Sequence, residues 1–322
     1  MGKLLIIVLM LSINVFGQSV NPKYTVKKNI IKTDNKIGRY NTIEYTVMQK
    51  DDKILYQIVD KVDYDIPFSK LQIFGNGNSV LLNAFYGKLT FINYNGAKVR
   101  TLNIQKDIEV EYERNILSVV DNNSLIIAFA LQNNDNSVIQ IYDENGMLKN
   151  EFEISLLNIN GIAFKEKLNK IFISNIVWNK YNEIEKKITI FDENGEVVKS
   201  FNSNFEKGFF TEDNKFIANT NKSVIAINAN NLEIIFKTEM NNGSILLDMA
   251  YINKEIFYAF ANTPTLANGK WFYENPTIIN INNRGKLIEE KSINKKTFSE
   301  LTLSNYNNKL KVIIDNVIVN LD

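Results

Sequence analysis

The chain has 322 residues, of which 45% are hydrophobic, and its 37 basic and 36 acidic side chains give a formal net charge of +1. This length allows a large buried core, and the charge balance gives no electrostatic reason to expect a nucleic-acid partner. Cysteine and histidine are absent, which excludes disulfides, thiol nucleophiles, the Ser-His-Asp mechanism and the usual zinc ligand sets.

The N-terminal residues have the pattern of an export signal. A basic start at Lys3 precedes an apolar run over residues 4–15, and the residues at Val15 and Gly17 are small enough for cleavage after Gly17. A spanning helix needs about 20 apolar residues, so we predict a signal peptide over 1–17 and no transmembrane segment. No cysteine is present to carry a lipid anchor, and we expect a periplasmic, cell-surface or secreted protein. The alternative is an N-terminal core helix or strand.

From residue 22 onward one strand pattern follows another, and no window has a convincing helical period. The first predicted strands are 24–31, 42–49 and 53–60. Five units of four predicted strands follow, and the C-terminus supplies a unit of three strands. The six units cover 71–104, 116–154, 161–201, 208–238, 246–293 and 298–321.

Each of the five four-stranded units ends in a similar hairpin. Residues 141–154 and 190–201 share Asp-Glu-Asn-Gly, and 91–102 carries Tyr-Asn-Gly. Asp is suited to accept hydrogen bonds at the start of a type I turn, and Gly is suited to the position with positive φ. We predict a hairpin with a glycine bulge. A calcium loop would need more carboxylates at alternate positions.

A four-stranded unit that recurs every 40 to 50 residues, roughly, is typical of a β-propeller. We predict an all-β fold in which residues 18–322 form one propeller domain of four-stranded blades. Seven blades are favoured, and six would result if residues 35–67 supplied only a partial blade. Pairing of the N- and C-terminal strands would close the ring and protect the edge strands.

The hydrophobic-aromatic-Asp-x-Asn-Gly hairpin, in an all-β repeat with an export signal, resembles the six- and seven-bladed propellers of the TolB-like, NHL-like and quinoprotein-like groups. The resemblance covers about residues 70–322 and concerns architecture. These groups include binding platforms, lactonases and quinone-dependent dehydrogenases. The histidines that typically serve the enzymes as ligands or bases are absent from this chain, as are the Trp-Asp and Gly-His marks of WD40 repeats.

The two longest connections between second and third strands, 178–186 and 262–276, contain both tryptophans of the chain. In a propeller these connections lie on one face, and aromatic side chains in loops are typical of contact surfaces. We predict that a protein or carbohydrate partner binds there; the alternative is that the rings pack on their own blades. The predicted contact residues are Trp178, Tyr181, Trp271, Phe272 and Tyr273.

The leading interpretation is a monomeric, non-catalytic binding or scaffold protein without cofactor or metal. One alternative is a propeller enzyme of the lactonase or lyase type with a carboxylate-bound metal in the central channel. The alternating acidic residues of 107–113 would suit a cation or, alternatively, a solvated strand edge. The other alternative is a structural component of the cell envelope.

Overall fold

A computed structural model describes the following residues: 23–32, 41–49, 53–62, 69–84, 86–104, 116–130, 136–156, 158–178, 183–205, 207–219, 223–239, 244–262, 264–267, 270–295, 297–306, 309–315 and 317–319. The predicted signal peptide and the acidic segment 107–113 lie outside these ranges. The chain forms two compact units, Met1–Ile159 and Asn160–Asp322.

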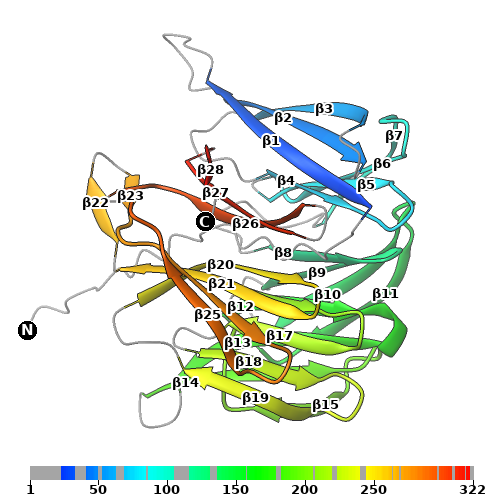
Figure 1. The fold of residues 1–322 in the computed structure, drawn as a ribbon. Coiled ribbons are helices and arrows are strands. Elements are labelled where there is room, and N and C mark those ends of the chain that lie inside the picture. The colour runs from blue at the N-terminus through cyan, green and yellow to red at the C-terminus, as the bar shows by residue number, and fades with distance from the viewer. Residues whose placement is uncertain are drawn as a thin grey trace, which may run out of the picture. The chain divides into compact units, whose positions relative to one another are not determined.

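The first unit contains three antiparallel sheets, each built from strands that follow one another in the sequence (Figure 1). The strands are β1 (Tyr24–Lys32), β2 (Asn41–Gln49) and β3 (Ile54–Val62) in the first sheet; β4 (Ser69–Ile73), β5 (Ser79–Asn83), β6 (Lys88–Ile92) and β7 (Lys98–Asn103) in the second; and β8 (Leu117–Asp121), β9 (Ser124–Ala130), β10 (Ser137–Asp143) and β11 (Leu148–Ile154) in the third.

The second unit contains four such sheets and a small separate hairpin, β22–β23. A short 3-10 helix, η1 (Glu166–Leu168), joins β12 to β13. The strands are β12 (Ile159–Lys165), β13 (Lys170–Trp178), β14 (Ile184–Phe191) and β15 (Val197–Phe201); β16 (Gly208–Phe210), β17 (Lys215–Asn219), β18 (Ser223–Asn228) and β19 (Glu233–Glu239); β20 (Ser244–Ile252), β21 (Glu255–Asn262), β24 (Thr277–Asn282) and β25 (Leu287–Ser292); β26 (Leu301–Tyr306), β27 (Lys309–Ile314) and β28 (Val317–Val319); and β22 (Thr265–Ala267) with β23 (Lys270–Phe272).

Seven blade sheets therefore follow one another along the chain, five with four strands and two with three in the described residues. This is the architecture of a seven-bladed β-propeller, so the predicted fold class and blade number are confirmed. The six-bladed alternative is wrong because β2 and β3 pair over their full lengths and, with β1, complete a sheet of their own. Closure of the ring by the two chain ends stays a prediction.

Position within a sheet decides how much of a strand is buried. The third strands β10, β18 and β24 are buried along nearly their whole length, whereas the fourth strands β7, β19 and β25 are mostly exposed. A strand covered on both faces reads as a continuous apolar run, and an edge strand carries Lys and Glu. Along the sequence, the apolar runs of the third strands alternate with the charged runs of the fourth strands.

The core lies between successive sheets. One cluster joins Leu82 and Phe91 of the second sheet to Leu125 and Ile127 of the third. In the second unit, Phe172 of β13 packs against Phe216 of β17 with ring centroids 4.6 Å apart. Each sheet thus removes its apolar face from water only through its neighbour.

The hairpins between third and fourth strands have the predicted turn. Asp143 Oδ1 accepts hydrogen bonds from the backbone N–H groups of Asn145 at 2.9 Å and Met147 at 2.8 Å. Gly146 has φ +79°, and the β10–β11 register shifts between Ile141 and Tyr142. The prediction of a glycine bulge is confirmed.

The hairpin glycine also contacts the preceding sheet. A Cβ added at Gly146 would lie 2.6 Å from Cδ2 of Phe91, and one at Gly96 would lie 2.8 Å from Cβ of Tyr56. Glycine is required there for two reasons, the backbone conformation and the close approach of a ring.

We expect Gly146→Ala to destabilise the protein more than Gly77→Ala. Both residues have positive φ, +79° and +90°, which costs an alanine about 1–2 kcal/mol. A Cβ at Gly77 would lie 3.0 Å from the hydroxyl oxygen of Tyr24, at the end of a side chain that can shift. At Gly146 the contact with Phe91 adds about 1–3 kcal/mol of overpacking. Chemical denaturation of both variants measures the difference, and equal losses would contradict the proposed role of the contact.

The last sheet is held at its end by Asp315. Its Oδ1 accepts hydrogen bonds from Ser299 N and Oγ, each at 2.9 Å, and from Glu300 N at 3.1 Å. Lys295 Nζ lies 3.8 Å from Oδ2. Partial burial raises the pKa of Asp315, but these hydrogen bonds and the lysine outweigh burial and hold the pKa below its usual value.

A carboxyl group whose pKa is lower in the folded protein than in the unfolded chain stabilises the fold at pH values above its pKa in the unfolded chain. This stabilisation is lost as the pH falls through its pKa in the folded protein. We therefore expect Asp315→Asn to be less stable than the unmodified chain at pH 7, with the difference shrinking below about pH 4. Thermal unfolding midpoints between pH 3 and 8, approximately, test this. A constant difference across this range would mean that the charge of Asp315 does not contribute.

Candidate functional site

The longer of the two predicted loops, 262–276, contains a hairpin. β22 and β23 pair with Thr265 opposite Phe272 and Leu266 opposite Trp271, and the hairpin stands apart from β20, β21 and β25 (Figure 1). The sequence has a signal for this structure, because Asn268-Gly269 between two short β-forming runs is a favoured hairpin dipeptide.

The base of this hairpin is fixed by backbone hydrogen bonds. Asn262 N donates to Glu274 O at 3.1 Å, and Tyr273 and Phe298 exchange two bonds of 2.8 and 3.1 Å. The rings of Tyr273 and Phe298 also pack, with centroids 5.7 Å apart. Tyr273 is only 8% exposed, so its ring belongs to the base of the hairpin.

The projecting strand β22 is exposed at all three residues. Leu266 leaves 58% of its surface in water, while Phe272 is half-buried. An exposed leucine on a hairpin with a fixed base is an apolar contact group that costs little entropy to present.

The other predicted loop is shorter in the structure than in the sequence prediction. β13 continues to Trp178, which pairs with Ile184 of β14, so the ladder includes residues that the prediction assigned to the loop. Ile184 is 54% exposed. Tyr181 lies outside the described residues.

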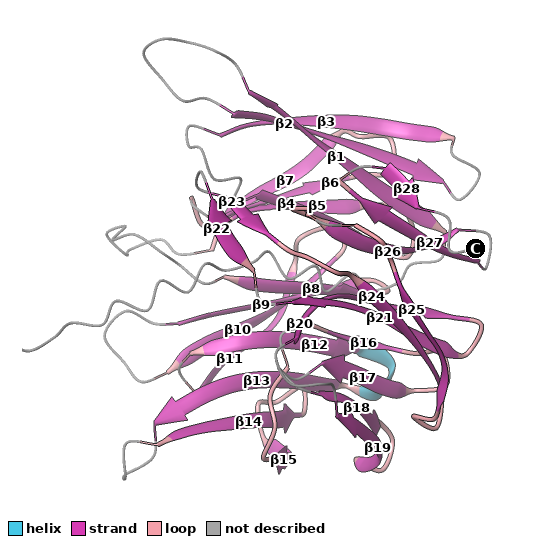
Figure 2. Ribbon diagram, turned by 60° about the vertical axis from the view of Figure 1, so that its left-hand side comes forward, coloured by secondary structure: helices cyan, strands magenta, loops and turns pink. Residues whose placement is uncertain are grey.

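Both connections lie at the same end of the sheets of the second unit. Figure 2 shows the end of β13 and the hairpin β22–β23 on the left side of that unit. The structure brings Phe272 and Tyr273 together at the hairpin and places Trp178 on another sheet.

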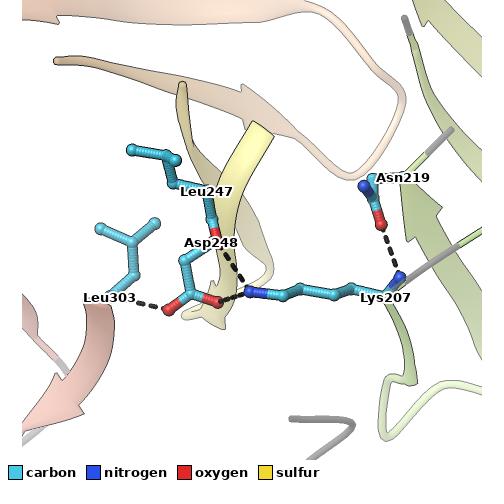
Figure 3. A network of polar contacts seen from close by, with 5 residues as sticks. All are labelled: Lys207, Asn219, Leu247, Asp248 and Leu303. Atoms are coloured by element: carbon cyan, nitrogen blue, oxygen red, sulfur yellow. Dashed lines mark hydrogen bonds and ion pairs between the residues drawn. The ribbon is translucent and has the colours of Figure 1, made fainter. Parts of the chain in front are cut away.

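A polar network between sheets was missed by the sequence reasoning (Figure 3). Lys207 Nζ donates to Leu247 O at 2.6 Å and lies 3.3 Å from Asp248 Oδ1. Asp248 Oδ2 accepts from Leu303 N at 2.8 Å, and Lys207 N donates to Asn219 Oδ1 at 2.8 Å. The β20–β21 register shifts between Leu246 and Asp248, which frees the Leu247 carbonyl.

This network joins three successive sheets, because Lys207 directly precedes β16, Asp248 lies in β20 and Leu303 lies in β26. Both oxygens of Asp248 already have partners within the protein, and so does the ammonium group of Lys207. A structural role follows, since binding a substrate would break these contacts. Lys207 and Asp248 are 41 positions apart, so no local motif could have indicated the pair.

In the first unit, Lys70 occupies a related position on β4. Its Nζ donates to Ser118 O of β8 at 3.1 Å, and burial lowers its pKa to about 8. Ser118 Oγ donates to Gln72 Oε1 at 2.7 Å, and Gln72 Nε2 donates back to Ser118 O at 3.3 Å. These contacts again link the first strands of neighbouring sheets.

Among the residues that the structure describes, no three His, Cys, Asp or Glu side chains gather as metal ligands. Within the same ranges no helix is long and apolar enough to cross a membrane.

Comparison with known proteins supports the fold alone. No protein-family model and no curated protein matches the sequence. Among solved structures, KlHsv2 with loop 6CD replaced by a Gly-Ser linker is similar over 90% of each chain, with a TM-score of 0.55 and 7% identity. A chain of hydrazine synthase from Kuenenia stuttgartiensis is similar over 78% of this chain and 75% of its own, with a TM-score of 0.53 and 15% identity. A chain of a mitotic checkpoint complex matches over 88% and 87%, with a TM-score of 0.52 and 11% identity.

We expect Asp248→Asn to destabilise the protein by about 1–3 kcal/mol, because it removes the charge beside Lys207 at a site where both side chains are mostly buried. Chemical denaturation measures the loss. The matched control is Glu289→Gln, whose ion pair with Lys291 at 3.4 Å is more exposed and should contribute less than about 0.5 kcal/mol. Similar small losses in both variants would show that the Asp248 network does not stabilise the sheets.

Proposed function

We propose that this protein is a non-catalytic binding protein that engages a protein or carbohydrate through the hairpin β22–β23 and the end of β13 and β14 that lies on the same side of the second unit. The observation that carries the proposal is the exposed strand β22 on an anchored base, with Leu266 58% exposed. A connection that served only to link β21 and β24 would need neither the extra pair of strands nor the exposed leucine.

The residues proposed to contact the partner are Trp178, Tyr181, Trp271 and Phe272. Trp271 and Trp178 each stand opposite an exposed aliphatic residue in the strand register, Leu266 and Ile184 respectively. Aromatic and aliphatic side chains on a rigid hairpin suit either the apolar face of a sugar ring or a hydrophobic side chain of a protein. Tyr273 would stabilise the base of the hairpin.

Export through a signal peptide at residues 1–17 is part of the proposal. The partner would then be an extracellular or envelope molecule, and the protein would bind it as a monomer. The absence of histidine and cysteine from the sequence favours binding over the hydrolytic reactions that depend on these residues.

We expect Trp271→Ala and Trp178→Ala to lose the partner while the unfolding midpoint changes little. The purified chain beginning at residue 18 would be immobilised and tested against envelope extract and a glycan array. Tyr94→Ala is the matched control, because Tyr94 is an exposed aromatic residue, 59% accessible, in a hairpin turn outside the proposed surface. Reduced stability with retained binding would instead mean that the tryptophans pack on their own sheets.

A further inference from the structure

The hairpins between third and fourth strands share one turn in four of the five complete sheets. In the turn of β10–β11, Asp143 Oδ1 accepts two backbone N–H groups, and Gly146 N donates to Asp143 O at 3.1 Å. The matching glycines donate to the residue three positions earlier and also have positive φ; they are Gly96, Gly195 and Gly285. The residue before the glycine is an asparagine in three turns and an arginine in the fourth: Asn95, Asn145, Asn194 and Arg284.

An asparagine that precedes a glycine can react with its own backbone. The nitrogen of the next residue attacks the side-chain Cγ and closes a five-membered ring, and a glycine places no side chain in the way. Asn145 is exposed, and its side-chain amide has no hydrogen-bond partner among the described residues. The turn lies at the end of a hairpin, where local opening costs little free energy. Asn145 can therefore rotate into the geometry that closes the ring.

The fold restrains a second Asn-Gly pair. Asn160 and Gly161 lie within β12, and Asn160 Oδ1 is buried. A Cβ added at Gly161 would meet the backbone oxygen of Phe205, so the segment is closely packed. Ring closure at Asn160 requires the chain to leave its extended conformation, and β12 must first open.

We propose that Asn145 is a site of self-catalysed modification, and that Asn95 and Asn194 in the matching turns share it. The Gly146 nitrogen forms a bond to Asn145 Cγ, and the bond from Cγ to Nδ2 breaks. The side-chain nitrogen leaves as ammonia, with the proton lost by Gly146. Water then opens the succinimide. Attack at Cγ gives aspartate, and attack at the backbone carbonyl carbon gives isoaspartate, in which the main chain runs through Cγ.

The fold requires the glycine that makes Asn145 reactive. Gly146 has positive φ and approaches Phe91 of the second sheet more closely than a side chain would allow. Isoaspartate lengthens the main chain by one methylene directly before this glycine, which displaces the glycine from Phe91 and weakens the packing of the third sheet on the second. The same consequence follows at Asn95, because Gly96 approaches Tyr56 of the first sheet.

The test incubates the full chain at mildly alkaline pH, where a backbone amide loses its proton more readily. Mass spectrometry of each Asn-Gly peptide detects the gain of about 1 Da, and enzymatic methylation distinguishes isoaspartate from aspartate. We expect Asn145 to react at least about tenfold faster than Asn160 in the folded chain, and the two rates to approach each other in urea. Equal rates in the folded chain, or reaction at Asn145 only in urea, would overturn the proposal.

The β24–β25 hairpin supplies a matched variant, because Arg284 takes the place of Asn145 in a turn with the same hydrogen bonds. We expect freshly prepared Asn145→Arg and Asn145→Asp to unfold at the same urea concentration as the native chain. After incubation, the native chain should unfold at a lower urea concentration than Asn145→Arg, which cannot form isoaspartate at this position. Equal losses in the native chain and Asn145→Arg would overturn the proposed effect on packing.

Discussion

The fold depends on one constraint: a sheet in this chain cannot bury its own apolar faces. Its third strand is apolar on both sides, and only the next sheet removes those side chains from water. The close approach of neighbours is made possible by glycine, since Gly146 allows Phe91 of the preceding sheet to lie where a side chain would otherwise be. Gly285 does the same for Phe236 in the second unit. The repeat is thus a packing unit as well as a sequence unit.

Most of the architecture could be predicted from the sequence because its determinants are local. Asp143 and Gly146 form their turn within four residues, and strand alternation is visible in short windows. The polar network of Lys207 and Asp248 could not be predicted, because it depends on a register shift in β20 and on the packing of three sheets. Interactions between distant positions leave no periodic signal in a single sequence.

In the candidate site, too, local features could be predicted from the sequence and contacts between distant positions could not. The positions of both long connections follow from the strand order. Whether an aromatic ring in them is buried depends on which residues from other parts of the chain pack against it. Tyr273 is buried because Phe298, 25 positions later, pairs with it through two backbone hydrogen bonds. Leu266, which was not among the predicted contact residues, is a large apolar residue that the hairpin exposes. The Asn268-Gly269 dipeptide was the available signal for that hairpin, and it indicates a turn but not which side chains face water.

The ladders join strands that are neighbours in the sequence, with the β21–β24 pair, separated by the β22–β23 hairpin, as the exception among the described blade sheets. Such pairing gives a low contact order for an all-β protein, so little loop-closure entropy opposes each step of folding. Each sheet can form as soon as its own strands have been synthesised, and the preceding sheet is already present to cover its apolar face. The order of the sequence is therefore also a workable order of assembly, from the N-terminal sheet to the last.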